Sequence, residues 1–415
     1  MPKYTHLGRA ISSHACLPAR LTQRRFYPHA DHVQTTMSRN SSRIAGRGVM
    51  TLRDKHRWER DNLSPFAQKS YESLGRKYPE TRSDPLDNRT EYEHDIDRIA
   101  YTIGFNRLSR KTQVFVDPVS DDIHTRIYHV IKVSRIVVDI CSYLRLNAQL
   151  GEAISLGHDN GHAPFGHEGE RVLSVILKDK LGEIFRHEWN SIRDLTVLER
   201  SDSYPDRPGI NLTGETLDGI GNHCGEHPIR VLSPRPKPRS FAELTRFEDP
   251  DQMPATLEGA VMHRCDILAY STADYRDGVN HGIFVKEELP RIVIDRLGTN
   301  SSQMLHVMVN DMKTFSLRAI EKGKPAIGLS EYIYEALDAL LAFNRGKLYH
   351  NDGLKGYTAK AQHCLTALFD YYTSTPDNPR KRQLTPQEAL DYIASMTDRK
   401  AINEYARIFN IAPTL

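Results

Sequence analysis

Apolar side chains recur at helical spacing through most of this 415-residue chain from Thr51 onward, and strand-like alternation is rare. The strongest case is residues 125–146, where small and apolar side chains follow one another at steps of three and four: Ile127, Val130, Ile131, Ser134, Val138 and Cys141. This spacing is typical of a buried helix face. We therefore predict an all-α fold.

Capping residues predict where further helices begin. Asn147 suits the start of a helix in which Leu150, Ile154 and His158 lie four apart, and another helix is expected from about Leu257. Residues 385–388, Thr-Pro-Gln-Glu, form a capping box with proline at the first helical position, which predicts a C-terminal helix. Loops are expected where prolines and charges gather, at 199–211, 234–238 and 376–382.

Residues 1–49 differ from the rest of the chain. They show no sustained period and hold eight basic side chains against one acid, Asp31. We expect a disordered basic tail or a mis-called start, with Met37 or Met50 as the true beginning; a mitochondrial-type presequence shares this composition. Residues 50–415 are predicted to form a single helical domain with a core at about 120–280.

Charge and cysteine content limit the function classes. The net charge is +3, but the first 49 residues contribute +7, so residues 50–415 stand at −4 and the case for nucleic-acid binding is weak. No run of eighteen apolar residues exists, which argues against a membrane span. Five cysteines far apart, without a CxxC pair, predict reduced thiols in a cytoplasmic protein.

The chemistry concentrates in residues 157–170, GHDNGHAPFGHEGE, which hold three histidines and three carboxylates among glycines and a proline. His158 and Asp159 at a helix end can present a nitrogen and an oxygen to one divalent ion. The glycines then let the backbone turn, so that His162 and His167 point back at the same cavity. A solvated polar loop is the alternative interpretation, which the density of histidines disfavours.

Two adjacent ligands do not complete a coordination shell, and two polar residues inside apolar helices are candidates for the others. His129 lies in the helix predicted over 125–146, and Asp266 lies in VMHRCDILAY. Taken singly, each is more often a satisfied core or boundary residue than a ligand. Composition and spacing alone leave both interpretations open.

The pattern H…HD…D resembles that of the HD superfamily, and within it the chain is similar to the dGTPase and dNTP triphosphohydrolase family. The resemblance covers nearly everything from Arg53 to Phe409, and residues 1–49 match nothing. Seven blocks occur in the family's order: 63–80, 98–115, 124–136, 153–170, 209–220, 258–279 and 391–409. It implies an HD-domain helical bundle with additional C-terminal helices.

The resemblance also implies the roles of individual residues. The implied metal ligands are His129, His158, Asp159 and Asp266. The implied substrate residues are Arg126 at a phosphate, Gln113 near the sugar 3′-hydroxyl, and Tyr270 and Asp274 at the deoxyribose, where the tyrosine ring would exclude a 2′-hydroxyl. We expect His162 to help Arg126 offset the triphosphate charge. The implied catalytic group is His167, Glu170 and His187. Basic residues such as Lys111 are expected to help offset the triphosphate charge.

The reaction implied is hydrolysis of a dNTP to deoxynucleoside and triphosphate. We assign His167 as the general acid, with Glu170 and His187 orienting or recharging it. Mixed histidine and carboxylate ligands suit Mn, Fe, Ni, Co or Zn, with Mg bridging phosphates. The family also implies a homo-oligomer, often a hexamer, and a dNTP effector. Glu188 and Gly214 depart from common family residues, which puts substrate preference in doubt.

Two other functions stay open at this point. One is an HD phosphohydrolase acting on a nucleoside monophosphate or an alarmone, which the four ligands cannot exclude. The other is a non-catalytic nucleotide-binding regulator, whose expected signature is a lost ligand or catalytic histidine; neither is missing.

Overall fold

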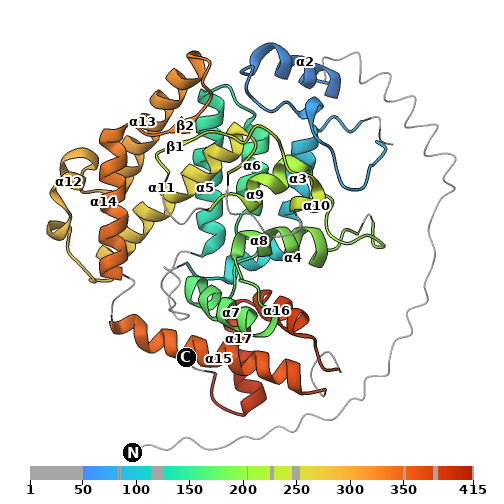
Figure 1. Cartoon of the computed structure of the whole chain (residues 1–415), viewed down its shortest axis with the longest axis vertical. Helices are drawn as coiled ribbons and strands as arrows, with labels where there is room; N and C mark the ends of the chain where they lie inside the picture. The colour runs from blue at the N-terminus through green and yellow to red at the C-terminus, as the bar shows by residue number, and fades with distance from the viewer. Residues whose placement is uncertain are drawn as a thin grey trace, which may run out of the picture. The chain divides into compact units, whose positions relative to one another are not determined.

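A computed structural model describes residues 50–82, 84, 86–113, 125–202, 204–224, 229–244, 253–348, 352–376 and 382–413. The tail predicted at 1–49 and residues 377–381 of one predicted loop lie outside the described residues. In the described part, the all-α prediction is confirmed (Figure 1).

The helices, in chain order, are α2 (Leu52–Asn62), α3 (Glu91–Ala100), α4 (Ile103–Arg107), α5 (Arg126–Tyr143), α6 (Ala148–Gly157), α7 (Gly166–Leu181), α8 (His187–Arg193), α9 (Gly214–Gly221), α10 (Phe241–Leu244), α11 (Leu257–Asn280), α12 (Arg291–Leu297), α13 (Ser301–Glu321), α14 (Glu331–Leu348), α15 (Asp352–Ser374), α16 (Pro386–Ala394) and α17 (Asp398–Phe409). Short 3-10 turns lie at Ser70–Glu72, Leu108–Arg110 and Lys286–Glu288, and a π turn at Asp194–Leu198. Strands β1 (Val231–Leu232) and β2 (Ile327–Gly328) pair antiparallel, with Val231 opposite Gly328.

Side-chain caps set the helix boundaries that the sequence predicts. The Asn147 side chain accepts hydrogen bonds from the amides of Gln149 and Leu150 at the start of α6. Thr385 and Glu388 form a capping box ahead of α16. Each cap satisfies amide groups that a first helical turn leaves without partners.

The buried face of α5 differs from the predicted one. Ile131 is half exposed, and Ile127 and Val138 are only partly buried. The buried stripe is shifted: it keeps Val130, Ser134 and Cys141 of the predicted set and adds Val133, Val137 and Ile140. This stripe also carries His129 and Arg126 inward, because α5 is covered by both α6 and α11. The prediction therefore left out the apolar Val133, Val137 and Ile140 as well as the polar Arg126 and His129.

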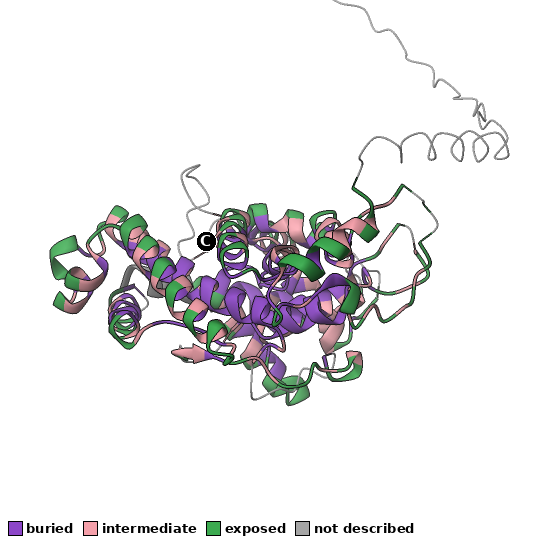
Figure 2. Ribbon diagram, turned by 90° about the horizontal axis from the view of Figure 1, so that it is seen from above, coloured by how far each residue is buried: buried purple, intermediate pink, exposed green. Residues whose placement is uncertain are grey.

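The helices bury two separate apolar clusters. The larger one is built mainly by α5, α6, α9, α11, α13 and α14, and the smaller by α7, α15, α16 and α17. Figure 2 shows the buried residues on the inward sides of these helices and exposed residues on the outer sides. Residues 158–165 connect a helix of the larger cluster, α6, to a helix of the smaller one, α7.

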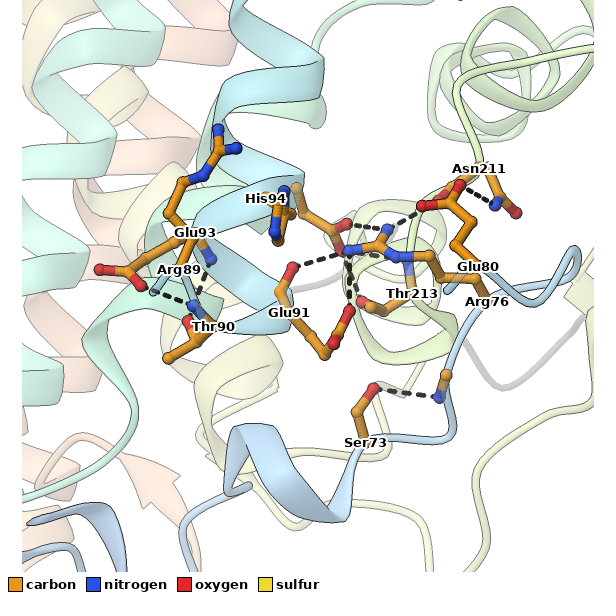
Figure 3. A network of polar contacts seen from close by, with 12 residues as sticks. Ser73, Arg76, Glu80, Arg89, Thr90, Glu91, Glu93, His94, Asn211 and Thr213 are labelled. Atoms are coloured by element: carbon orange, nitrogen blue, oxygen red, sulfur yellow. Dashed lines mark hydrogen bonds and ion pairs between the residues drawn. The ribbon is translucent and has the colours of Figure 1, made fainter. Parts of the chain in front are cut away.

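A polar network fixes the segment before α3 to the segment before α9 (Figure 3). Arg76 donates to Asp95 at 2.5 Å and to the backbone carbonyl of Asn211 at 2.7 Å. Asp95 also accepts from the amide and hydroxyl of Thr213, the N-terminal cap of α9. Because both Arg76 and Asp95 are nearly excluded from solvent, these charge-assisted bonds hold the start of α9 firmly.

Candidate active site

The four predicted metal ligands converge from three helices. His129 comes from α5, His158 and Asp159 follow the last residue of α6, and Asp266 lies in α11. The His129 Nε2 atom lies 2.9 Å from Asp266 Oδ1. The His158 Nε2 atom lies 3.4 Å from Asp159 Oδ1 and 3.8 Å from Asp266 Oδ1. All four side chains are buried or nearly so.

The orientation of His158 fits a bound cation. Its Nδ1 lies 2.7 Å from the carbonyl oxygen of Ser155, which fixes Nδ1 as the protonated nitrogen. Its Nε2 is fully buried and has no hydrogen-bond partner among the described residues. Buried polar atoms rarely stay unpaired, and metal-ligating histidines usually tie their second nitrogen in this way. The donor set therefore fits a divalent ion held by imidazole and carboxylate.

Asp159 stays ionised despite its burial. Burial alone would raise its pKa, but His158, His162 and the Arg126 guanidinium hold the pKa of Asp159 well below its usual range. Arg126 donates from Nη1 to Asp159 Oδ2 at 3.0 Å. Burial likewise opposes ionisation of Asp266, yet the bond from His129 and the positive charges nearby lower its pKa. Both carboxylates are thus available as anionic ligands.

Close backbone packing explains the glycines of this turn. A Cβ on Gly161 would lie 2.1 Å from the Ser191 amide nitrogen, and one on Gly169 would lie 1.8 Å from the Pro164 carbonyl oxygen. Phe165 adopts a left-handed conformation, with φ of 68°, and its amide donates to Asp398 at the start of α17. The turn is therefore held against α8 and α17, and not free as a solvated loop would be.

His162 points inward as predicted. Its Nε2 lies 3.3 Å from Asp159 Oδ1, and its ring stacks on His187 with centroids 3.9 Å apart. Burial and then Arg126 hold its pKa well below the usual value, so the ring is neutral near pH 7. Its Nδ1 has no hydrogen-bond partner among the described residues.

The expectation that Lys111 faces the phosphates is wrong. Its side chain is buried, and its ammonium group donates to the backbone carbonyls of His162 and Ala394. Lys111 therefore connects the His162 turn to the end of α16, and its charge serves this internal contact.

His167 and Glu170, in the first turn of α7, lie in a row with His187, the first residue of α8. His187 Nδ1 is 3.1 Å from both carboxylate oxygens of Glu170, and His167 Nδ1 is 3.7 Å from Glu170 Oε2. Burial would raise the pKa of Glu170, but His187 and His167 lower it strongly. The His167 side chain is 64% exposed, whereas that of His187 is 10% exposed. The row thus runs from the buried His187 to the exposed His167.

The predicted sugar-side residues share a face of α11 with Asp266. Tyr270 is half-buried one turn after Asp266, and Asp274 is buried one turn further on. Burial raises the pKa of Tyr270, and the charges of Asp266, Asp274 and Cys224 raise it further, so these groups lie near the phenol. Gln113 is half-buried, and a Cβ on Gly166 would lie 2.7 Å from its carbonyl oxygen and 3.4 Å from Arg126 Nη2.

Two residues at this site were missed by the sequence reasoning. His223 and Cys224 follow α9, and the donor atoms of His223, His158 and Asp266 lie within 4.8 Å of one another. The adjacent His-Cys pair in GNHCGEH was the available signal for a ligand pair. A search for CxxC spacing alone does not detect it. The described cysteines Cys141, Cys224, Cys265 and Cys364 are free thiols, as predicted.

The phosphohydrolase-associated domain matches residues 327–407, which span α14 to α17. No helix in the described part of the chain is long and apolar enough to cross a bilayer.

Several curated relatives match the chain over nearly its whole length. Proteins named deoxyguanosinetriphosphate triphosphohydrolase-like are 34% identical in Desulfatibacillum aliphaticivorans, covering 88% of this chain and 99% of the relative, and 37% identical in Caldanaerobacter subterraneus, covering 85% and 93%. One from Bordetella pertussis is 31% identical, covering 85% and 97%. The chain therefore belongs to the deoxyguanosinetriphosphate triphosphohydrolase-like family of HD phosphohydrolases.

Proposed function

We propose that this protein hydrolyses a deoxynucleoside triphosphate to a deoxynucleoside and inorganic triphosphate. Water would attack the α-phosphorus, the bond from that phosphorus to the 5′-oxygen would break, and the 5′-oxygen would leave with a proton. The observation that carries the proposal is the convergence of His129, Asp159 and Asp266 on the Nε2 of His158, which has no hydrogen-bond partner among the described residues. Arg126 and the His167–Glu170–His187 row lie beside them.

His129, His158, Asp159 and Asp266 would hold one divalent ion. When bound, such an ion supplies Lewis acidity that activates water and draws charge from the α-phosphate. The residues of the chain fix its place: the Ser155 carbonyl orients His158, and Arg126 orients Asp159. Mn, Fe, Ni, Co or Zn would suit this donor set.

Arg126 and His162 would bind the phosphates. The Arg126 guanidinium already neutralises Asp159 through Nη1, while its buried Nε has no hydrogen-bond partner among the described residues. The Nδ1 of His162 is likewise open. Because His162 is neutral near pH 7, it would contribute a hydrogen bond, and Arg126 would contribute the positive charge.

His167 would act as the general acid for the leaving 5′-oxygen, a poor leaving group unless it is protonated. A histidine titrates in the range that this role needs. Its exposed ring can reach a substrate, and ionised Glu170 beside it would orient the ring. His187 would hold Glu170 in place through Nδ1 from the buried side.

Tyr270, Asp274 and Gln113 would recognise the sugar. The tyrosine ring would pack on C2′ and exclude a 2′-hydroxyl, and Asp274 would accept a hydrogen bond from the deoxyribose. These roles rest on the family resemblance, with the common face of Asp266, Tyr270 and Asp274 on α11 as support.

The test is incubation of Mn²⁺-loaded protein with each dNTP and rNTP, followed by chromatography of the products. Inorganic triphosphate and a deoxynucleoside are expected from at least one dNTP. Asp159→Ala should abolish turnover, whereas Asp295→Ala, which removes a half-exposed carboxylate on α12, should not. Release of orthophosphate from a nucleoside monophosphate, or turnover only of an alarmone, would replace this proposal with another HD phosphohydrolase activity.

A further inference from the structure

A second set of metal-type donors lies beside the site described above. The Nε2 atom of His187 is 3.2 Å from the Nε2 atom of His223 and 3.2 Å from the Sγ atom of Cys224. The three donor atoms all lie within 4.8 Å of one another. His187 begins α8, and His223 and Cys224 follow the end of α9, so two helices that pack together bring the donors to one point.

Both imidazoles are oriented through their other nitrogens. His223 Nδ1 lies 2.6 Å from the carbonyl oxygen of Ile220, which can only accept, so Nδ1 carries the proton and Nε2 presents a lone pair. His187 Nδ1 lies 3.1 Å from the Glu170 carboxylate. A histidine whose second nitrogen donates to a carboxylate or backbone carbonyl is the usual arrangement of a zinc-ligating imidazole.

The separations fit a tetrahedral ion. With bonds of about 2.0–2.1 Å to nitrogen and about 2.3 Å to sulfur, two nitrogens on one Zn²⁺ lie about 3.3 Å apart, and a nitrogen and a sulfur about 3.5 Å apart. The 3.2 Å observed for the two pairs that include His187 is within a few tenths of an ångström of these values, and the third pair lies within 4.8 Å.

We propose that His187, His223 and Cys224 form a second metal site, which takes a thiophilic divalent ion of the zinc class. Two imidazoles and one thiolate make three ligands, and the fourth position is left for water or a substrate oxygen. This inference goes beyond the proposed function, which uses only the Nδ1 side of His187 to hold Glu170.

The cysteine separates this site from the His158–Asp159 site chemically. Thiolate favours Zn²⁺ over Mg²⁺ or Mn²⁺, whereas the first site offers only imidazole and carboxylate. Burial raises the pKa of the Cys224 thiol to about 12, so binding an ion would release its proton. Without an ion, a protonated His187 would instead lie between the Glu170 carboxylate on its Nδ1 side and His223 and Cys224 on its Nε2 side. The test must exclude this alternative.

The test uses Co²⁺ alone, added to full-length protein from which metals have been removed with a chelator. A cobalt–thiolate bond gives a near-ultraviolet charge-transfer absorption that imidazole and carboxylate ligands do not give. We expect this band in the wild-type chain and in Cys364→Ser, whose sulfur is buried among α15 and α17. Cys224→Ser should lose the band and one equivalent of bound cobalt.

The two sites can fail independently. Asp159→Ala should lose one equivalent of cobalt but keep the sulfur band, so a failure of the proposed function would leave the second site intact. Cobalt bound to the wild-type chain without the band, or a band that survives in Cys224→Ser, would overturn the proposal.

A measurement on the wild-type chain covers the case in which the variant does not fold. Zn²⁺ at ten times its dissociation constant should slow alkylation of Cys224 by about tenfold, as mapped by mass spectrometry. Unchanged alkylation would likewise overturn it.

Discussion

His129 and Asp266 are 137 residues apart in the chain, yet His129 Nε2 and Asp266 Oδ1 lie 2.9 Å apart where α5 packs on α11. Each is a polar residue on the buried face of a largely apolar helix. A contact of this kind between two otherwise costly buried groups fits a cation site, because the Nε2 of His158 beside it has no hydrogen-bond partner among the described residues.

Asp266→Ala should remove the ion of this site. The remaining ligands would bind it at least about 100-fold more weakly, because loss even of a group that only supports a ligand costs 10–100-fold in affinity. Metal content by mass spectrometry and the Mn²⁺-dependent rise in melting temperature would measure the loss. Asp295→Ala is the matched control. An Asp266→Ala chain with normal Mn²⁺ affinity would show that the ion lies elsewhere.

Tyr270→Ala should weaken discrimination against ribonucleotides. If the ring excludes a 2′-hydroxyl by packing, its removal should lower the dNTP-to-rNTP ratio of kcat/KM by about 10- to 100-fold, the range expected for steric selection by a pocket wall. Parallel assays of one dNTP and its rNTP would measure the ratio.

The control for this experiment is Tyr332→Ala, which removes an exposed ring on α14. An unchanged ratio in Tyr270→Ala, together with a lower rate on both substrates, would assign Tyr270 a role in binding without selection.

The sequence predicted the helices and the His158-Asp159 corner because local signals were strong at those places. Asn147 and Thr385 cap the helices they were expected to begin, and the His158-Asp159 pair lies at a helix end as expected. The family resemblance supplied His129 and Asp266, which spacing alone left open.

What the sequence could not predict depends on packing between distant segments. Lys111 was expected at the phosphates, but its direction is set by carbonyls of His162 and Ala394, which are 51 and 283 residues away. His223 acquires significance only because α8 and α9 pack together. Which face of α5 is buried depends on its two packing neighbours, α6 and α11. The spacing of apolar residues within α5 does not specify those neighbours.

Glu258→Gln should stabilise the protein at alkaline pH. The carboxylate of Glu258 is fully buried on α11; its Oε1 accepts from the amides of Asn147 and Gln68, and its Oε2 has no partner among the described residues. Burial raises its pKa to about 7. Between pH 4.5 and about pH 7 the folded protein therefore keeps a proton on Glu258 that the unfolded chain has released. The free energy of unfolding falls as the pH rises through this range.

Glutamine keeps an oxygen that can accept the two amide hydrogen bonds, and it has no ionisable group. The free energy of unfolding of the variant should therefore not fall over this pH range. The variant should match the wild type near pH 4.5 and exceed its free energy of unfolding by up to about 3 kcal/mol at pH 8, since each pKa unit is worth about 1.4 kcal/mol. Urea denaturation at both pH values would measure the difference. A constant offset between the two proteins at both pH values would show that Glu258 does not titrate in this range.

Arg264→Met should also stabilise the protein, at all pH values where arginine is charged. The Arg264 side chain is fully buried on α11, and none of its three guanidinium nitrogens has a hydrogen-bond partner among the described residues. Burial lowers its pKa to about 10, which reflects the cost of keeping the charge there. Methionine fills similar length without charge, so the free energy of unfolding should rise by about 1–3 kcal/mol, the cost of unsatisfied buried polar groups. Thermal melting would measure it, with Arg291→Met, at a highly exposed position, as the control expected to change little. Destabilisation by Arg264→Met would instead mean that an anionic or carbonyl acceptor, from a bound molecule or another chain, pairs with this guanidinium in the native protein.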